Sequence, residues 1–386
     1  MSTIERRQPP PRKGPDPAEG AGDTTGAAPT VWSRWPAWIG YAAAAWSLVY
    51  GVLGLWWALG GGGFPFGSAN DPGAALSVLG GARAETSAPV IAALGLAGAV
   101  AAVTMVRRRE RGTLGALLLS LAWAVAAGLA LVIPDYRVLV AVAYAPIVLI
   151  GAPFGWPPGV SILDAFPWPV VNQFLCIAGG FLWAATAVAY GRRSRGTGAH
   201  CGRPEAGTGW NSPAIAARWG RLAVYVAVAI PIFYAATRWA WALGIPLGIS
   251  EEFLREGQEI GLWWAGAGLA TIAVVGAVLT LGLVQGWGEV FPRWIPFLGG
   301  RRVPIWFVVV PASLVSVLVT TAGLMFVRLT LTGKLDAILG EGMLSSENWA
   351  ALAPELLWPV WGAALGAATL AYYYRRRSRR VHCGRP

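Results

Sequence analysis

Histidine, cysteine and charged residues are scarce in this chain. Its 386 residues contain two histidines and three cysteines, and only 13% are charged, about half the usual share of soluble domains. Neither histidine lies in an apolar run, which argues against haem ligation by histidine and against a serine–histidine protease within a membrane. The apolar runs contain no Asp or Glu, which argues against an aspartyl membrane protease and a proton relay. We therefore expect no enzymatic activity and no cofactor.

Apolar residues, by contrast, make up 55% of the chain, and the mean hydropathy is +0.53. Charges cluster between apolar runs of roughly twenty residues, the length that crosses a bilayer as a helix. The runs are continuous and rich in Ala, Leu and Val, without the alternation of barrel strands. The sequence predicts an all-α, polytopic membrane helical bundle with about eight transmembrane helices, near 36–59, 88–106, 114–133, 170–190, 219–244, 260–284, 303–327 and 356–374.

Basic residues predict the topology. With eight crossings and a cytoplasmic N-terminus, all but six of the 30 Lys and Arg residues fall on the cytoplasmic side, as the positive-inside rule requires. The apolar segment 137–151 would invert the later topology if it crossed, so we expect a re-entrant or interfacial helix there. The predicted location is the cell membrane, with both termini cytoplasmic. The six outer bases are Arg83, Arg137, Arg238, Arg255, Arg328 and Lys334.

Two pairs of matching segments indicate an internal duplication. FLWAATAVAYGRRSRGTGAHCGRP, ending at 204, matches GAALGAATLAYYYRRRSRRVHCGRP, ending at 386. RWPAWIGYAAAAWSLVYGVLGLWWALG, from 34, matches RWGRLAVYVAVAIPIFYAATRWAWALG, from 218, at a similar spacing. We predict two tandem four-helix repeats, parallel because four crossings return the chain to the same side. The predicted parts are a disordered cytoplasmic tail at 1–35, repeats at 36–190 and 218–374, a cytoplasmic linker at 191–217 and an Arg-rich cytoplasmic tail at 375–386.

The composition also indicates a resemblance. Arginine outnumbers lysine 28 to 2, Ala, Gly and Trp are abundant, and an Arg-rich tail closes the chain. In composition and layout the whole chain resembles the uncharacterised multi-pass integral membrane proteins of high-GC actinobacteria. The resemblance carries no activity with it.

Two sets of polar residues are candidate functional residues. One is a stripe on a single helical face, where hydroxyls line a path for a polar solute or bond a neighbouring helix: Ser313, Ser316, Thr320 and Thr321. The other set follows the apolar runs and is suited to anionic lipid headgroups or an acidic cytoplasmic protein partner: Arg192, Arg193, Arg195, Arg375, Arg376, Arg377, Arg379 and Arg380. In a membrane protein, the net charge of +11 indicates such contacts rather than nucleic acid.

The pentapeptide HCGRP occurs twice and holds both histidines. If the two copies met, they would offer a Cys₂His₂ set for zinc: His200, Cys201, His382 and Cys383. We predict no metal site, because adjacent His-Cys is not the usual ligand spacing and the flanking Arg-rich segments repel one another. Duplication alone accounts for the two copies.

Two functions fit these observations. The first is a non-enzymatic carrier or binding protein for a small or lipidic molecule, with its site between the two halves, lined by the helix at 303–327 and the segment 137–169. The second is a membrane-embedded sensor or scaffold that uses its Arg-rich segments. Eleven of the 22 tryptophans, Trp241 and Trp263 among them, lie at predicted helix ends and are interpreted as headgroup-level anchors.

Overall fold

The structure, a computed structural model, describes residues 35–108, 112–151, 153, 166–194, 212–335 and 346–378. The described residues are helical apart from loops and one isolated antiparallel bridge between Val290 and Arg302. The predicted all-α class is confirmed. The chain divides into two units, Met1–Trp35 and Pro36–Pro386, and the second holds all the contacts described below.

Among the described residues, seven helices are long and apolar enough to cross a membrane. Each corresponds to one of the predicted crossings, and together they make the protein a multi-pass helical membrane protein. They are α1 (Trp35–Ala58), α2 (Ala84–Arg107), α3 (Thr113–Ala127) with its π-helical continuation to Val132, α6 (Trp168–Ser194), α7 (Pro213–Ala242), α9 (Leu262–Leu281) and α10 (Ile305–Leu331).

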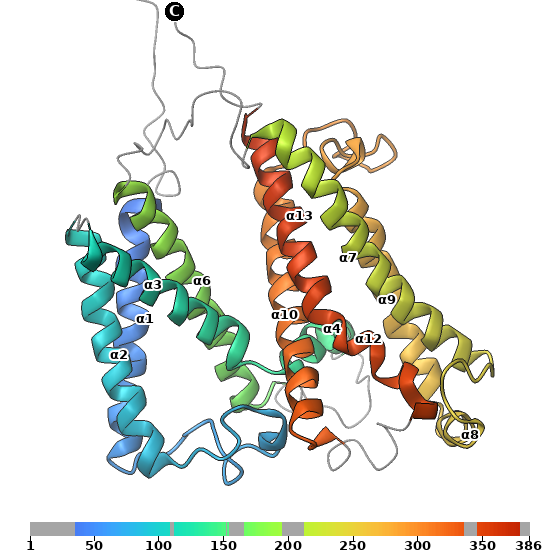
Figure 1. Cartoon of the computed structure of the whole chain (residues 1–386), viewed down its shortest axis with the longest axis horizontal. Coiled ribbons are helices and arrows are strands. Elements are labelled where there is room, and N and C mark those ends of the chain that lie inside the picture. Colours follow the sequence, from blue (N-terminus) through green and yellow to red (C-terminus); the bar gives the residue numbers. More distant parts are fainter. Residues whose placement is uncertain are drawn as a thin grey trace, which may run out of the picture. The chain divides into compact units, whose positions relative to one another are not determined.

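The eighth predicted crossing, 356–374, is a helix of 21 residues, α13 (Trp358–Ser378). It is long enough to cross, but its C-terminal part, YYYRRRS, makes it less apolar than the other seven. Helix α13 packs along α7 and α10 (Figure 1). Its crossing of the membrane therefore stays a prediction.

In the described part of the chain, three shorter α-helices lie between the long ones: α4 (Tyr136–Gly151), α8 (Glu251–Glu259) and α12 (Ala353–Leu356). Helix α4 has 16 residues and is not among the seven long helices. It covers the segment predicted to be re-entrant or interfacial, and its depth in the membrane stays a prediction.

The linker between the predicted halves is shorter than its expected range of 191–217. Helix α6 continues to Ser194, and α7 begins at Pro213 rather than near 219. Ser212 caps α7, since its hydroxyl accepts a hydrogen bond from Ile215 N at 3.4 Å, and proline is favoured in a first helical turn. Residues 195–211 lie outside the described part of the chain.

Small residues allow close packing within each half. A Cβ atom on Gly54 of α1 would lie 2.5 Å from Ala92 N of α2, so these two backbones touch directly. One core cluster joins α1, α2, α3 and α6 around the buried Trp183 and Tyr190. A separate cluster joins α7, α10 and α13 around the buried Tyr372.

Helix α10 joins the two predicted halves of the chain. It packs against α4 and against the π-helical turn that ends α3. At this contact the buried Leu318 of α10 lies in one cluster with Val138 of α4 and Ile177 of α6. Figure 1 shows α4 beside α10. Helix α10 and the segments that border it therefore form the junction of the two predicted halves.

Candidate functional site

The hydroxyl stripe of α10 faces α13. Ser316 Oγ donates to Gly362 O across the helix interface at 2.8 Å, whereas Thr320 and Thr321 donate to carbonyl oxygens of α10 itself. The approach is close, because a Cβ on Gly362 would lie 2.7 Å from Ser316 O. These contacts support helix packing for Ser316. A path-lining role for Ser313, Ser316, Thr320 and Thr321 stays a prediction.

Several of the candidate arginines bind backbone carbonyl oxygens near the ends of helices. Arg193 donates to Met105 O at 3.1 Å, Arg375 to Leu283 O at 2.8 Å, and Arg376 to Val303 O at 2.8 Å. Their contact with lipid stays a prediction, as does that of Arg192. Arg195, Arg379 and Arg380 lie outside the described residues, as does the side chain of Arg377.

The HCGRP copies cannot be placed. His200, Cys201, His382 and Cys383 all lie outside the described residues, so the prediction about metal there is untested. Within the described ranges, no group of three or more His, Cys, Asp or Glu side chains is arranged to hold a metal ion.

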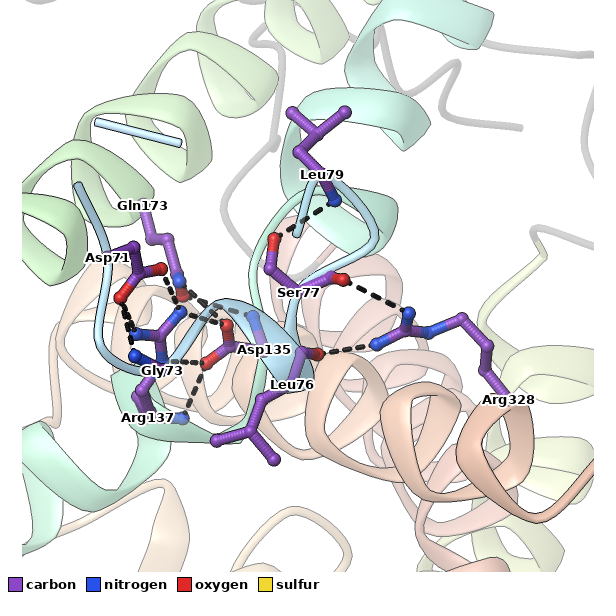
Figure 2. A network of polar contacts seen from close by, with 9 residues as sticks. All are labelled: Asp71, Gly73, Leu76, Ser77, Leu79, Asp135, Arg137, Gln173 and Arg328. Carbon is purple, nitrogen blue, oxygen red and sulfur yellow. Dashed lines mark hydrogen bonds and ion pairs between the residues drawn. The ribbon is translucent and has the colours of Figure 1, made fainter. Parts of the chain in front are cut away.

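A buried ion cluster, the Arg137 cluster, lies where the loop after α1 meets the start of α4 (Figure 2). The guanidinium of Arg137 binds Asp71 through Nη1 and Nη2 at 2.6 and 2.9 Å. It binds Asp135 through Nε and Nη2 at 2.8 and 2.6 Å. The side chains of Asp71 and Asp135 are only 4% and 2% exposed. One arginine therefore holds two buried carboxylates, each through the paired geometry that makes arginine–carboxylate bonds strong.

The Arg137 cluster has no free carboxylate oxygen. Asp71 Oδ1 also accepts from Gly73 N at 2.9 Å, and Asp135 Oδ2 also accepts from Gln173 Nε2 of α6 at 2.8 Å. Burial opposes the charge of Arg137, but hydrogen bonds to Asp135 and Asp71 outweigh it and hold the pKa of the guanidinium above its ordinary value. Saturated groups of this kind fix the fold, and we interpret the cluster as structural.

Arg328 joins α10 to the same loop. It donates to Leu76 O, and its Nη1 donates to Ser77 O at 3.2 Å. Figure 2 shows this arginine reaching from its helix toward the short 3₁₀ turn Ala74–Leu76. The loop after α1 is thus joined to α4 through Arg137 and to α10 through Arg328. Asp135, which also binds Arg137, extends the network to Gln173 of α6.

A second buried ion pair, the Arg238 cluster, lies near the end of α7. Arg238 Nη2 binds Glu355 Oε1 of α12 and donates to Ala351 O at 3.4 Å, and Nη1 donates to Ala350 O at 3.2 Å. Its guanidinium carbon lies 4.6 Å from the ring centre of Tyr234 and 4.3 Å from that of Trp241. These rings stabilise the cation by cation–π attraction.

The Arg238 cluster differs from the Arg137 cluster because it is not saturated. Glu355 Oε2 and Trp358 Nε1 are buried and have no hydrogen-bond partner. The Glu355 side chain is only 9% exposed. Burial raises the pKa of the Glu355 carboxyl, and the neighbouring Arg238 opposes the shift. The cluster presents one acceptor and one donor that a bound polar group would satisfy.

Aromatic rings extend from this cluster to the other half. The Trp358 ring centre lies 6.0 Å from that of Tyr234 in α7 and 5.8 Å from that of Phe326 in α10. Phe326 in turn lies 6.2 Å from Tyr136 in α4. Together with Glu355, these four rings define the candidate site, which is bordered by α4 from the first half and by α7, α10, α12 and α13 from the second.

Sequence reasoning missed these clusters, although one signal pointed to them. Three of the six bases that the predicted topology places outside bind buried carboxylates or backbone carbonyl oxygens: Arg137, Arg238 and Arg328. A base on the side where the positive-inside rule expects few bases needs a local partner. This argument would have selected these three arginines from the sequence. The anchor interpretation was wrong for Trp241 and Trp263, which are only 1% and 6% exposed and lie in the protein core.

The fold defines the class of this protein: an integral, multi-pass helical membrane protein. Neither a family model nor any curated protein or solved structure matches the chain.

Proposed function

We propose that the protein is a non-enzymatic carrier or binding protein for a small or lipidic molecule. The observation that carries the proposal is the row of rings from Tyr136 through Phe326 and Trp358 to Tyr234, which links the two halves beside an unsatisfied donor and acceptor. Ligand sites commonly combine such apolar and aromatic walls with a few polar groups. The site lies where α10 meets α4, at one end of the region expected from the sequence.

Phe326→Leu tests the proposal, because leucine keeps the apolar character of the position but removes the ring. Protein extracted gently from its own membrane is expected to carry a bound small molecule, visible as an added mass by native mass spectrometry. Phe326→Leu is expected to lose most of it, since an aromatic contact contributes about 0.5–1.5 kcal/mol beyond its area.

Phe307→Leu is the matched control. It makes the same change on the same helix at a position 52% exposed, whose ring packs on Phe291 and Trp306, and it should keep the molecule. A wild-type protein without any added mass, or equal retention by both variants, would contradict the proposal.

We also propose that α13 is the eighth crossing and that the chain is two parallel four-helix repeats. In support, three pairs of corresponding helices approach one another in both halves. Helices α7 and α9, α7 and α13, and α10 and α13 pack together in the second half. In the first half α3 packs on α6, α1 approaches α2 at Gly54, and Tyr50 of α1 donates to Asn172 of α6.

Two arginines support the duplication further. Arg193, at the end of α6, donates to a carbonyl at the end of α2, and Arg375, at the end of α13, donates to a carbonyl just after α9. By the repeat, α2 and α9 are both the second helix of their half. The same bond in the same place is what a duplicated unit would keep.

Thiol labelling of intact cells tests this topology. With Cys176 and Cys201 replaced by serine, the natural Cys383 is the only cysteine left. If α13 crosses and both termini are cytoplasmic, an impermeant maleimide should leave Cys383 unlabelled until the cells are opened. A cysteine placed at the exposed Ser68 should label in intact cells. Labelling of both positions, or of Cys383 alone, would show the eight-crossing arrangement to be wrong.

The sensor or scaffold function is the second candidate. Arg193 and Arg375 lie in the last turns of α6 and α13, next to Arg-rich segments suited to anionic headgroups or an acidic cytoplasmic partner, at about 1 kcal/mol per residue near a membrane surface. Membership of the high-GC actinobacterial group stays part of this proposal and rests on composition alone.

A further inference from the structure

Two unsatisfied polar atoms single out the Arg238 cluster. Glu355 Oε2 can accept hydrogen bonds and Trp358 Nε1 can donate one, yet each is buried without a partner. Leaving such groups unpaired is costly, more so for a carboxylate than for a neutral group. Buried atoms of this kind are few in folded proteins, and each calls for an explanation.

The two atoms share their surroundings. Glu355 and Trp358 are three residues apart across the junction of α12 and α13. The Tyr234 ring lies 6.0 Å from the Trp358 ring and 4.6 Å from the guanidinium that binds Glu355. Both residues are therefore linked to the Tyr234 ring, at one end of the row of rings that continues through Trp358 and Phe326 to Tyr136.

From this geometry we infer that the site binds a neutral alcohol: a hydroxyl group carried on an apolar body, such as a long-chain or lipid alcohol. The inference rests on the proposed binding function and specifies its ligand. A hydroxyl donates once and accepts twice, so one such group has both the donor that Glu355 Oε2 lacks and the acceptor that Trp358 Nε1 lacks. The apolar body packs on the aromatic rings.

Charge balance selects a hydroxyl over an ion. Arg238 and Glu355 already neutralise each other in a buried setting. An ammonium group would add a second cation beside Arg238, and a carboxylate would add a second anion beside Glu355. Either would leave an uncompensated buried charge, which is strongly unfavourable. A hydroxyl satisfies both atoms and adds no charge.

The first half offers an internal comparison. Tyr50 and Tyr234 occupy matching positions in the two repeated segments, 34–60 and 218–244. The hydroxyl of Tyr50 donates to Asn172 Oδ1 at 2.9 Å, and both side chains are buried. There the protein supplies its own hydroxyl to a buried acceptor. In the second half, the hydroxyl of the ligand is the donor to the buried acceptor Glu355 Oε2.

The experiment compares two photoreactive probes on purified wild-type protein in nanodiscs: a diazirine-bearing hexadecanol and its methyl ether. The ether can still accept from Trp358 but cannot donate to Glu355. Saturable labelling is mapped by mass spectrometry to peptides that contain Phe326 or Trp358. The alcohol is expected to saturate at a concentration about tenfold lower than the ether, as a hydrogen bond to a charged group implies.

Two variants separate the hydrogen bond to Glu355 from the hydrogen bond from Trp358, and a third is the control. Glu355→Gln should remove most of the alcohol's advantage over the ether. Trp358→Phe, which keeps the ring and so guards against loss of the fold, should weaken both probes several-fold and leave their ratio unchanged. Trp264→Phe, at a position 62% exposed, should change neither probe.

Equal saturation by the alcohol and the ether in the wild type would overturn the inference and leave the proposed binding function standing, with water alone on the two polar atoms. Absence of saturable labelling by both probes would overturn the binding function as well.

Discussion

Arg137→Met is expected to destabilise the protein by about 3–5 kcal/mol, because it leaves the Asp71 and Asp135 carboxylates buried without a counter-charge. Methionine keeps the apolar part of the arginine side chain, so the loss reports the missing charge and its hydrogen bonds. The buried Cys176 provides the measurement. With Cys201 and Cys383 replaced by serine, its reaction with a thiol dye on heating follows the opening of α6.

Two further variants make the Arg137 result specific. Arg137→Lys keeps the charge but cannot bind two carboxylates in paired geometry, so a smaller loss is expected. Arg255→Met removes an arginine whose side chain is 71% exposed and pairs with Glu259 at 4.0 Å; such a surface pair contributes little, and its unfolding temperature should match that of the parent. Equal unfolding temperatures for Arg137→Met and Arg255→Met would refute a structural role for the Arg137 cluster.

Arg238→Met is the second large prediction, again with an expected loss of about 3–5 kcal/mol. It leaves Glu355 buried, with a partner on neither oxygen, and removes the donor to Ala350 and Ala351. The loss should depend on pH. Burial already raises the pKa of Glu355, and Arg238 opposes that rise, so the variant should raise the pKa further.

The sign of the pH effect follows from that direction. A carboxyl whose pKa is higher in the folded than in the unfolded state contributes stability below its unfolded pKa and loses it as the pH rises through the folded pKa. The Arg238→Met variant should therefore be more stable at about pH 5 than at about pH 8, and the difference should exceed that of the wild type. A loss that is the same at both pH values would contradict burial of an ionised Glu355.

The long helices could be predicted from the sequence because one physical term dominates them. Runs such as α2 and α10 are apolar over a length that spans the bilayer core, and neither a soluble fold nor a barrel suits them. The crossing predicted at 356–374 is less apolar than the others, because the tyrosines and arginines of α13 offset its apolar start. The N-terminus of α7 was misplaced by six residues, because the cap by Ser212 lies in a polar stretch that hydropathy does not reveal.

The candidate site could not be predicted because its parts come together only in three dimensions. Arg238 and Glu355 are 117 residues apart, and neither belongs to a recognisable motif. The hydroxyl stripe was visible because its residues recur at helical spacing on one face. The hydrogen-bond partner of Ser316 in that stripe is the backbone carbonyl of Gly362, which no sequence pattern reveals.

The bonds from Arg328 to the loop of the first half set an order for assembly in the cell. The loop after α1 is synthesised early, yet the donor for Leu76 O and Ser77 O arrives more than 200 residues later. At typical synthesis rates of about 5–20 residues per second, those carbonyl oxygens lack the Arg328 donor for many seconds while the chain grows. The loop after α1 therefore gains these two hydrogen bonds only after α10 has been synthesised. A chain that stalls before α10 would leave the carbonyl oxygens of Leu76 and Ser77 without this donor and expose an unfinished loop to membrane quality control.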